Sequence, residues 1–330
     1  MERQNFKRIC LKKQHKSNKD RKLFFDKEFS HKVTESLNLF SGILISGNDK
    51  QMRWRNGRKS SNVEDRRGMR VPIKAIGGGI GGLMVLVIAL LLGVDPGNTS
   101  NVNPTSNFDP ASLSAVDREL ADFVSVVLAD TEDTWNELFA AEGLDYREPT
   151  LVLFSDAVES SCGLAQSAMG PFYCPADEKV YIDLSFYRDL KERHGAPGDF
   201  AQAYVIAHEV GHHVQNLLGI SERVQDAQQG LSQVDANRLS VMQELQADCF
   251  AGVWAYNADR ARGVLEQGDI EEGLNAASSI GDDRLQMESQ GRVTPDSFTH
   301  GTSVQRVSWF QTGLDSGDID SCNTFGGASP

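Results

Sequence analysis

The stretch VIAHEVGHHVQNLLG, residues 205–219, places two histidines four positions apart with a glutamate directly after the first. On an α-helix, residues four apart lie about 40° apart around the axis and one turn along it, so His208 and His212 can bind one cation. Zinc held in this way keeps open coordination positions and lowers the pKa of a bound water to roughly 7. Glu209 is then placed to accept that water's proton, so the HExxH pattern predicts a zinc hydrolase.

The residues around the two histidines favour this interpretation over a chance match. They are apolar or small, as expected of a helix buried against a sheet with only its metal ligands polar. Gly211 is costly inside a helix, and a close approach of a backbone or of the metal would explain it. His213 points about 100° away from His212 and is expected to pack or to form hydrogen bonds rather than to bind the metal.

A third protein ligand is needed to complete such a site. The metzincin pattern HExxHxxGxxH is excluded, because Gln215 and Leu218 stand where its glycine and third histidine are required. The later stretch ELQADCFAGVW places Glu244 and Asp248 four apart on an expected helix. Glu244 could complete the site, and Asp248 could orient a histidine by accepting its remaining ring proton. The alternative is a solvated helix face, which the apolar neighbours of this pair make the weaker interpretation.

The charge of the 330-residue chain is divided unevenly. Residues 1–74 carry 20 Lys and Arg against 8 Asp and Glu, whereas residues 75–330 carry 13 against 38. Between them, residues 75–94 contain no charge, and their length matches the roughly 20 residues of a transmembrane helix. Because the basic residues precede this span, the positive-inside rule predicts residues 52–74 as a cytoplasmic segment and the C-terminal part outside. The alternatives are a cleaved signal peptide and a soluble or secreted form released near residue 95.

The rest of the chain divides by composition. Residues 1–51 are Lys-rich without sustained periodicity and are expected to be a disordered extension. Met52 is a plausible alternative start of the protein. Residues 95–112 are rich in Pro, Asn, Ser and Gly and are expected to link the membrane to a folded domain at 113–330. The acidic C-terminal part disfavours nucleic acid as a partner.

The expected elements of the domain indicate an α+β fold. Residues 113–142 have the apolar spacing of a long amphipathic helix, and the stretches PTLVLFS and KVYIDLSF indicate strands. Short helices are expected at 187–193 and from Gly198 onward, and helices then predominate to about Ala277. The order of helix, strands and helices predicts a zincin-like domain with a small sheet and a helical active-site region, preceded by one transmembrane helix.

Four of the five cysteines follow the predicted span, and an even number in an oxidising compartment permits two disulfides. Proximity in sequence favours Cys162 with Cys174, which leaves Cys249 with Cys322. Buried free thiols are the alternative. Metal binding by these cysteines is not expected, because no CxxC spacing occurs.

The stretches HEVGHH, ELQADCFAG, GPFYCPADEKVYIDLSF and THGTSVQRVSWF, with RRG before a single apolar span, together resemble the neutral zinc metallopeptidases of bacteria, a group related to the gluzincins. The resemblance covers roughly Met52 to the C-terminus. It implies a protein of the bacterial cytoplasmic membrane whose catalytic domain, outside the membrane, hydrolyses peptides or proteins. It also implies that Zn²⁺ is bound by His208, His212 and Glu244. Glu209 would then be the general base, and Asp248 an acid beside the ligands.

Two points stay open at this stage. In the gluzincin scheme a distant His or Tyr donates a hydrogen bond to the oxyanion, and His300 could fill that role, with a helix-capping or core histidine as the alternative. Tyr204 is a weaker candidate for the same role. The rival function is a binding or assembly factor in which the same residues hold a structural zinc, although structural sites are usually closed by four protein ligands.

Overall fold

The computed structural model describes residues 52–68 and 114–326, which belong to one compact unit spanning Lys50–Pro330. The strands are β1 (Val63–Asp65), β2 (Thr150–Phe154), β3 (Ala157–Ser160), β4 (Gly163–Gln166), β5 (Phe172–Cys174) and β6 (Lys179–Asp183). The α-helices are α4 (Ala115–Ala141), α5 (Ser185–Glu192), α6 (Asp199–Leu217), α7 (Ile220–Gln228), α8 (Gln233–Arg262), α9 (Asp269–Ser279), α10 (Asp282–Gln290) and α11 (Ser303–Ser316). Short 3-10 helices are η3 (Ser167–Met169), η4 (Pro295–Ser297) and η5 (Ile319–Ser321).

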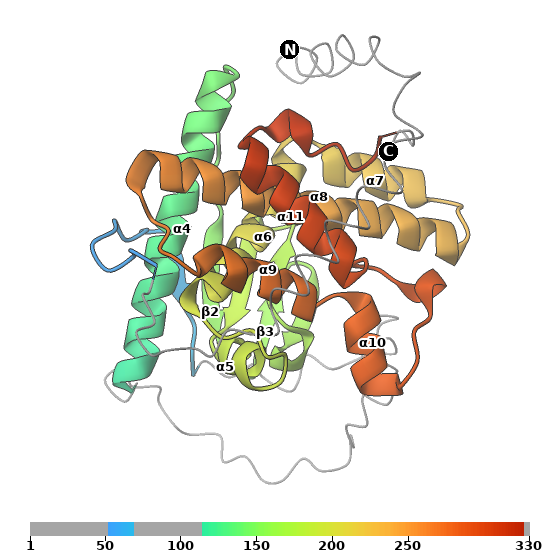
Figure 1. The fold of residues 1–330 in the computed structure, drawn as a ribbon, viewed down its shortest axis with the longest axis horizontal. Helices are drawn as coiled ribbons and strands as arrows, with labels where there is room; N and C mark the ends of the chain where they lie inside the picture. The colour runs from blue at the N-terminus through green and yellow to red at the C-terminus, as the bar shows by residue number, and fades with distance from the viewer. Residues whose placement is uncertain (1–51, 69–113, 327–330) are drawn as a thin grey trace. The chain divides into compact units, whose positions relative to one another are not determined.

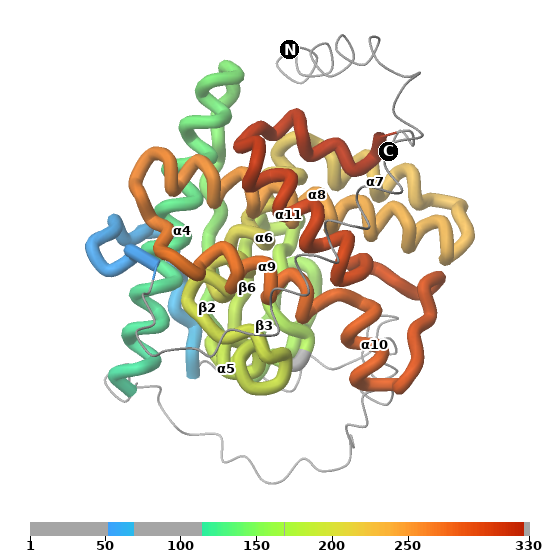
Figure 2. The backbone as a smooth tube through the Cα atoms, in the orientation of Figure 1, coloured from blue at the N-terminus to red at the C-terminus, as the bar shows by residue number. Residues whose placement is uncertain are grey.

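A four-stranded sheet in the order β1-β2-β6-β5 supports one side of the helical region. β1 and β6 pair parallel to β2, and β5 runs antiparallel to β6; β3 and β4 form a separate hairpin. The central strands β2 and β6 are almost fully buried, as expected of parallel strands covered on both faces. Figure 2 shows β2 and β6 beside each other, with the hairpin strand β3 nearby.

The long helix α4 packs against α6 and α8 (Figure 1). It begins at a capping box in which Ser114 and Asp117 satisfy each other's backbone N–H groups. Trp135 on this helix is fully buried and lies edge-on to Phe250 of α8, 5.6 Å away between ring centroids. The helix predicted over residues 113–142 is therefore confirmed, and so are the predicted α+β class and the strands at PTLVLFS and KVYID.

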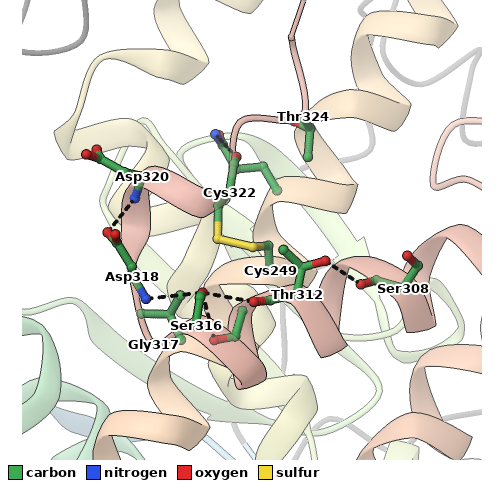
Figure 3. Close-up of a disulfide and its surroundings, with 12 residues drawn as sticks. Cys249, Ser308, Thr312, Ser316, Gly317, Asp318, Asp320, Cys322 and Thr324 are labelled. Atoms are coloured by element: carbon green, nitrogen blue, oxygen red, sulfur yellow. Dashed lines mark hydrogen bonds between the residues drawn. A yellow bond between two sulfur atoms is a disulfide. The ribbon is translucent and has the colours of Figure 1, made fainter. Parts of the chain in front are cut away.

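Helix α11 crosses α8 at two glycines that leave no room for a side chain. A Cβ atom on Gly252 would lie 2.1 Å from the carbonyl oxygen of Phe310, and one on Gly313 would lie 1.9 Å from that of Cys249. The same crossing carries the Cys249–Cys322 disulfide, which joins α8 to the segment after α11 (Figure 3). The second disulfide joins Cys162 to Cys174, so both predicted pairings are confirmed.

Residues 52–68 are part of the fold of the main domain rather than a separate segment. β1 pairs with β2, and the preceding residues contact α4: Ser60 and Asn62 both donate hydrogen bonds to the fully buried carboxylate of Glu132, at 2.5 and 2.9 Å. Strands that share hydrogen bonds must lie on the same side of a membrane. The prediction of a cytoplasmic segment at 52–74 and a domain outside, separated by one membrane crossing, therefore conflicts with this pairing and is corrected: residues 52–68 and 114–326 share one side.

The sequence missed β1 because three residues with two acids among them carry no strand pattern of their own. The predicted extension at 1–51, span at 75–94 and linker at 95–112 lie outside the described residues. Among residues 52–68 and 114–326, no helix is long and apolar enough to span a bilayer.

Candidate zinc centre

Three side chains from α6 and α8 converge on one point. Nε2 of His208 lies 3.2 Å and Nε2 of His212 lies 3.4 Å from the same oxygen, Oε2 of Glu244. Ligand atoms on a tetrahedral zinc, at bond lengths of about 2.0–2.2 Å, lie roughly 3.4 Å apart. Two imidazole nitrogens and one carboxylate oxygen with these separations therefore fit Zn²⁺, and the predicted ligands are brought together.

The close crossing of α6 and α8 sets the distance between the histidines and the glutamate. A Cβ atom on Gly211 would lie 3.0 Å from the carbonyl oxygen and 3.2 Å from the Cα atom of Ala247. These contacts are tighter than ordinary van der Waals contact, so a side chain at this position would push the helices apart. Of the two explanations offered for Gly211 from the sequence, the structure supports the close approach of a backbone.

His208 is held by a buried network below the ligand atoms. Its Nδ1 lies 2.8 Å from Oδ1 of Asp248, which is fully buried. The guanidinium of Arg306 on α11 donates to both oxygens of Asp248, at 2.9 Å each, and the hydroxyl of Tyr204 donates to Oδ1. Asp248 therefore has the contact with a histidine ring on which its predicted orienting role depends. The predicted alternative role of Tyr204 at the oxyanion is wrong, because its side chain is fully buried and its hydroxyl is engaged by Asp248.

The pKa values within this network follow from burial and charge. Burial would raise the pKa of Asp248, but Arg306 and His208 lower it to about 2. Burial would lower the pKa of His208, but Asp248 and Glu244 raise it to about 10. The Nε2 proton of His208 therefore stands where a metal ion would bind, while Asp248 keeps the proton on Nδ1. A divalent cation that replaces the proton on Nε2 of His208 leaves the hydrogen bond from Nδ1 to Asp248 intact.

The second histidine ligand is oriented differently. Nδ1 of His212 lies 2.9 Å from Oε1 of Gln215, whose amide group donates to the backbone oxygen of Gln243 at 2.7 Å. Gln215 is fully buried. The sequence analysis used Gln215 only to exclude the metzincin pattern and missed its contact with His212. Its position one turn along the same helix was the available signal.

The remaining candidate residues take distinct positions. Glu209 is 8% exposed, and its carboxylate has no hydrogen-bond partner within the described ranges. His213 is fully buried, with Nδ1 3.0 Å from the hydroxyl of Tyr173, so its predicted packing role is confirmed. His300 is half-exposed and lies 3.2 Å from Asp282 through Nδ1. Burial would lower the pKa of His300, but Asp282 and Glu244 raise it.

A cavity of about 560 Å³ opens near the candidate ligands, between the first half of α8, η4 and α11. Leu245, which directly follows the ligand Glu244, is part of its wall, and Phe298, two residues before His300, is another part. The wall also contains Met242 and Trp309. The zinc-ligand side chains themselves do not line it, so it adjoins the centre rather than containing it.

The fold and the centre together define an HExxH zinc-peptidase type of site, and comparison with known proteins assigns the family. Residues 52–325 match the family model described as "Putative neutral zinc metallopeptidase". The chain belongs to this family, as the sequence resemblance indicated.

Its relatives include two proteins that share most of its length. It is 55% identical over 290 residues to "Uncharacterized protein YpfJ" of Escherichia coli K12, covering 83% of this chain and 99% of that protein. It is 43% identical over 256 residues to "Uncharacterized protein Rv2575" of Mycobacterium tuberculosis H37Rv, covering 73% of this chain and 86% of that protein. No solved structure matches the chain.

Proposed function

We propose that this protein is a zinc metallopeptidase that hydrolyses peptide bonds. The observation that carries the proposal is the convergence of His208, His212 and Glu244 with separations of 3.2 and 3.4 Å between ligand atoms. Zinc bound by these residues supplies a Lewis acid and a bound water of lowered pKa. The family match supports the class of enzyme.

The roles of the protein's own residues follow from their positions. Glu209, the residue after the first ligand, accepts the proton of the attacking water, and its carboxylate has no competing partner in the described part of the chain. Asp248 holds the Nδ1 proton of His208 and so fixes the direction of the ligand nitrogen. His300, half-exposed and with a pKa that Glu244 helps to raise, is assigned the donation of a hydrogen bond to the oxyanion that forms on the substrate.

A purely structural zinc site is the rival function. Structural zinc is usually enclosed by four protein ligands. The cluster of metal-binding groups here contains three residues, and Glu244 retains a side-chain exposure of 20%. Three ligands, with an adjacent acid and an exposed side, favour a catalytic site.

The substrate is proposed to be a peptide or protein with an apolar side chain near the cleaved bond. The support is the cavity next to Glu244, whose wall is mostly apolar: Val234, Val241, Met242, Leu245, Val293, Phe298 and Trp309 among others. We further propose that the domain works outside the cytoplasm, because its two disulfides are stable in an oxidising compartment. In this proposal residues 52–68 lie on the same side as the domain, because β1 pairs with β2.

Two isosteric substitutions separate the base from the ligand. Glu209→Gln should retain about one zinc per chain and lose hydrolysis of a peptide library, because Glu209 moves a proton and does not hold the metal. Glu244→Gln should lose zinc on dialysis, because an amide oxygen is a weaker ligand than a carboxylate. Metal analysis and digestion of the library, with and without a chelator, provide the readouts. Full zinc in Glu244→Gln would refute the ligand assignment, and unchanged activity in Glu209→Gln would refute the proposed enzyme.

A further inference from the structure

A second group of acidic side chains lies away from the zinc centre. Asp199 is the first residue of α6, and Asp269 and Glu272 lie in the first turn of α9. One oxygen of each carboxylate lies within 4.8 Å of the others. Since His208 follows Asp199 by nine residues on the same helix, the two groups are separated by roughly 13 Å along its axis.

One of these carboxylates is buried and two are half-buried, and Glu272 accepts a hydrogen bond from the backbone nitrogen of Phe200 at 3.1 Å. Asp269 is fully buried, and its Oδ1 has no hydrogen-bond partner; the same is true of the buried Oδ2 of Asp199. Within the described ranges, none of the three forms an ion pair with a lysine or arginine. Burial together with the neighbouring acids raises the pKa of Asp269 to about 6 and that of Glu272 to about 7. Buried carboxylates are costly unless they are paired or protonated, so a cation bound among these three would stabilise their charged forms.

One nitrogen already points into the group. The backbone nitrogen of Met52 donates a hydrogen bond to Oδ1 of Asp199 at 3.2 Å. The Met52 side chain is 3% exposed and is part of the main hydrophobic core. As a peptide amide this nitrogen has one hydrogen and no charge. As an α-amino group it has three N–H donors and a full positive charge, which matches the unpaired oxygens of Asp199 and Asp269.

The comparisons agree with a chain that starts at this point. The family match begins at residue 52. The match to the relative from Escherichia coli covers 99% of that protein but only 83% of this chain. That protein therefore has almost no residues left over to correspond to the rest of this chain.

We propose that Asp199, Asp269 and Glu272 form a binding pocket for an α-ammonium group, which Met52 supplies when it is the first residue of the chain. The bound terminus fixes the start of the arm at residues 52–62, which leads into β1, and links that arm to the first turns of α6 and α9. The pocket is independent of the proposed peptidase function, because it contains none of the zinc ligands and none of the residues assigned to the chemistry.

The occupant is tested with two forms of the protein. One begins at Met52; the other has five neutral Gly and Ser residues before Met52, which convert the α-amino group into an amide and move the charge away. The shorter form contains the whole described unit, with its own core and both disulfides. Each form is made with Asp269→Asn, with Glu272→Gln, and with Glu271→Gln as the control, since Glu271 is an exposed acid beside Glu272 on the same helix.

Only the form that begins at Met52 should be destabilised by these changes. In the form beginning at Met52, Asp269→Asn and Glu272→Gln should each lower the melting temperature by roughly 3–10 °C, because each removes a charge-assisted hydrogen bond. In the extended form the same changes should leave it unchanged or raise it, because they relieve repulsion between acids. Glu271→Gln should have the same small effect in both forms. If the Asp269→Asn variant does not fold, the comparison of the two forms rests on Glu272→Gln.

Equal shifts in the two forms would overturn the proposal. It would also be overturned if 5 mM Ca²⁺ raised the melting temperature of both forms and Asp269→Asn abolished the increase, because the pocket would then be a metal site. The zinc content of every variant should stay near one per chain, so a failure here is distinguishable from a failure of the zinc centre. Mass spectrometry of the protein purified from its own host should find a free amino terminus at Met52, and peptides from residues 1–51 in the mature protein would contradict this.

Discussion

Removing Arg306 should destabilise the protein much more than the loss of an ordinary hydrogen bond. Arg306 is 2% exposed and Asp248 is fully buried, so Arg306→Met leaves the carboxylate of Asp248 buried without its guanidinium partner. Breaking a buried pair by removing one partner typically costs about 3–5 kcal/mol. The pKa of Asp248, which burial raises but Arg306 and His208 lower to about 2, gives a net preference for the charged form of about 2–3 kcal/mol. By either value, the loss of stability caused by Arg306→Met is a large part of a typical unfolding free energy of about 5–15 kcal/mol.

The assay is urea unfolding in the presence of a chelator, which separates folding from metal binding. Tyr204→Phe is the matched control, because it removes one hydrogen bond to the same carboxylate and should cost only about 1 kcal/mol. The double variant Arg306→Met with Asp248→Asn should be more stable than Arg306→Met alone, because no lone charge is left. The reasoning is refuted if Arg306→Met costs less than about 1 kcal/mol, or if Asp248→Asn adds to its cost instead of reducing it.

Two further predictions concern metal binding. The affinity for zinc should fall as the pH falls, by about tenfold per pH unit for each proton displaced, because zinc must replace the Nε2 proton of His208. Burial lowers the pKa of His208, but Asp248 and Glu244 raise it to about 10, so this proton is bound at neutral pH. Competition with a chelator at pH 6, 7 and 8 measures the affinity, and a flat profile would contradict the prediction. Gly211→Ala should weaken zinc binding while changing stability by no more than about 2 kcal/mol, because the added methyl group pushes against Ala247 while alanine favours the helix by about 1 kcal/mol. Unchanged zinc affinity in this variant, measured by the same competition, would show that the helix crossing does not set the ligand distances.

The sequence by itself determined the parts of this protein that depend on local geometry. Helical periodicity is enough to place His208 and His212 on one face, because residues four apart are neighbours on any α-helix. The same rule relates Glu244 to Asp248. The even number of cysteines and their spacing were enough to predict both disulfides, because one pair is close in sequence and only one other pairing was left.

Only the tertiary structure decided which distant segments meet. Arg306 is 58 residues from Asp248 along the chain, so no local pattern relates it to the zinc ligands. β1 joins the sheet through backbone hydrogen bonds to β2, and such bonds depend on position rather than on side-chain type, so its residues carry no sign of the pairing. That pairing places residues 52–68 beside the domain and overrides the topology inferred from charge. Met52 and Asp199 meet in the same way, 147 residues apart, because the arm and the start of α6 pack into one core.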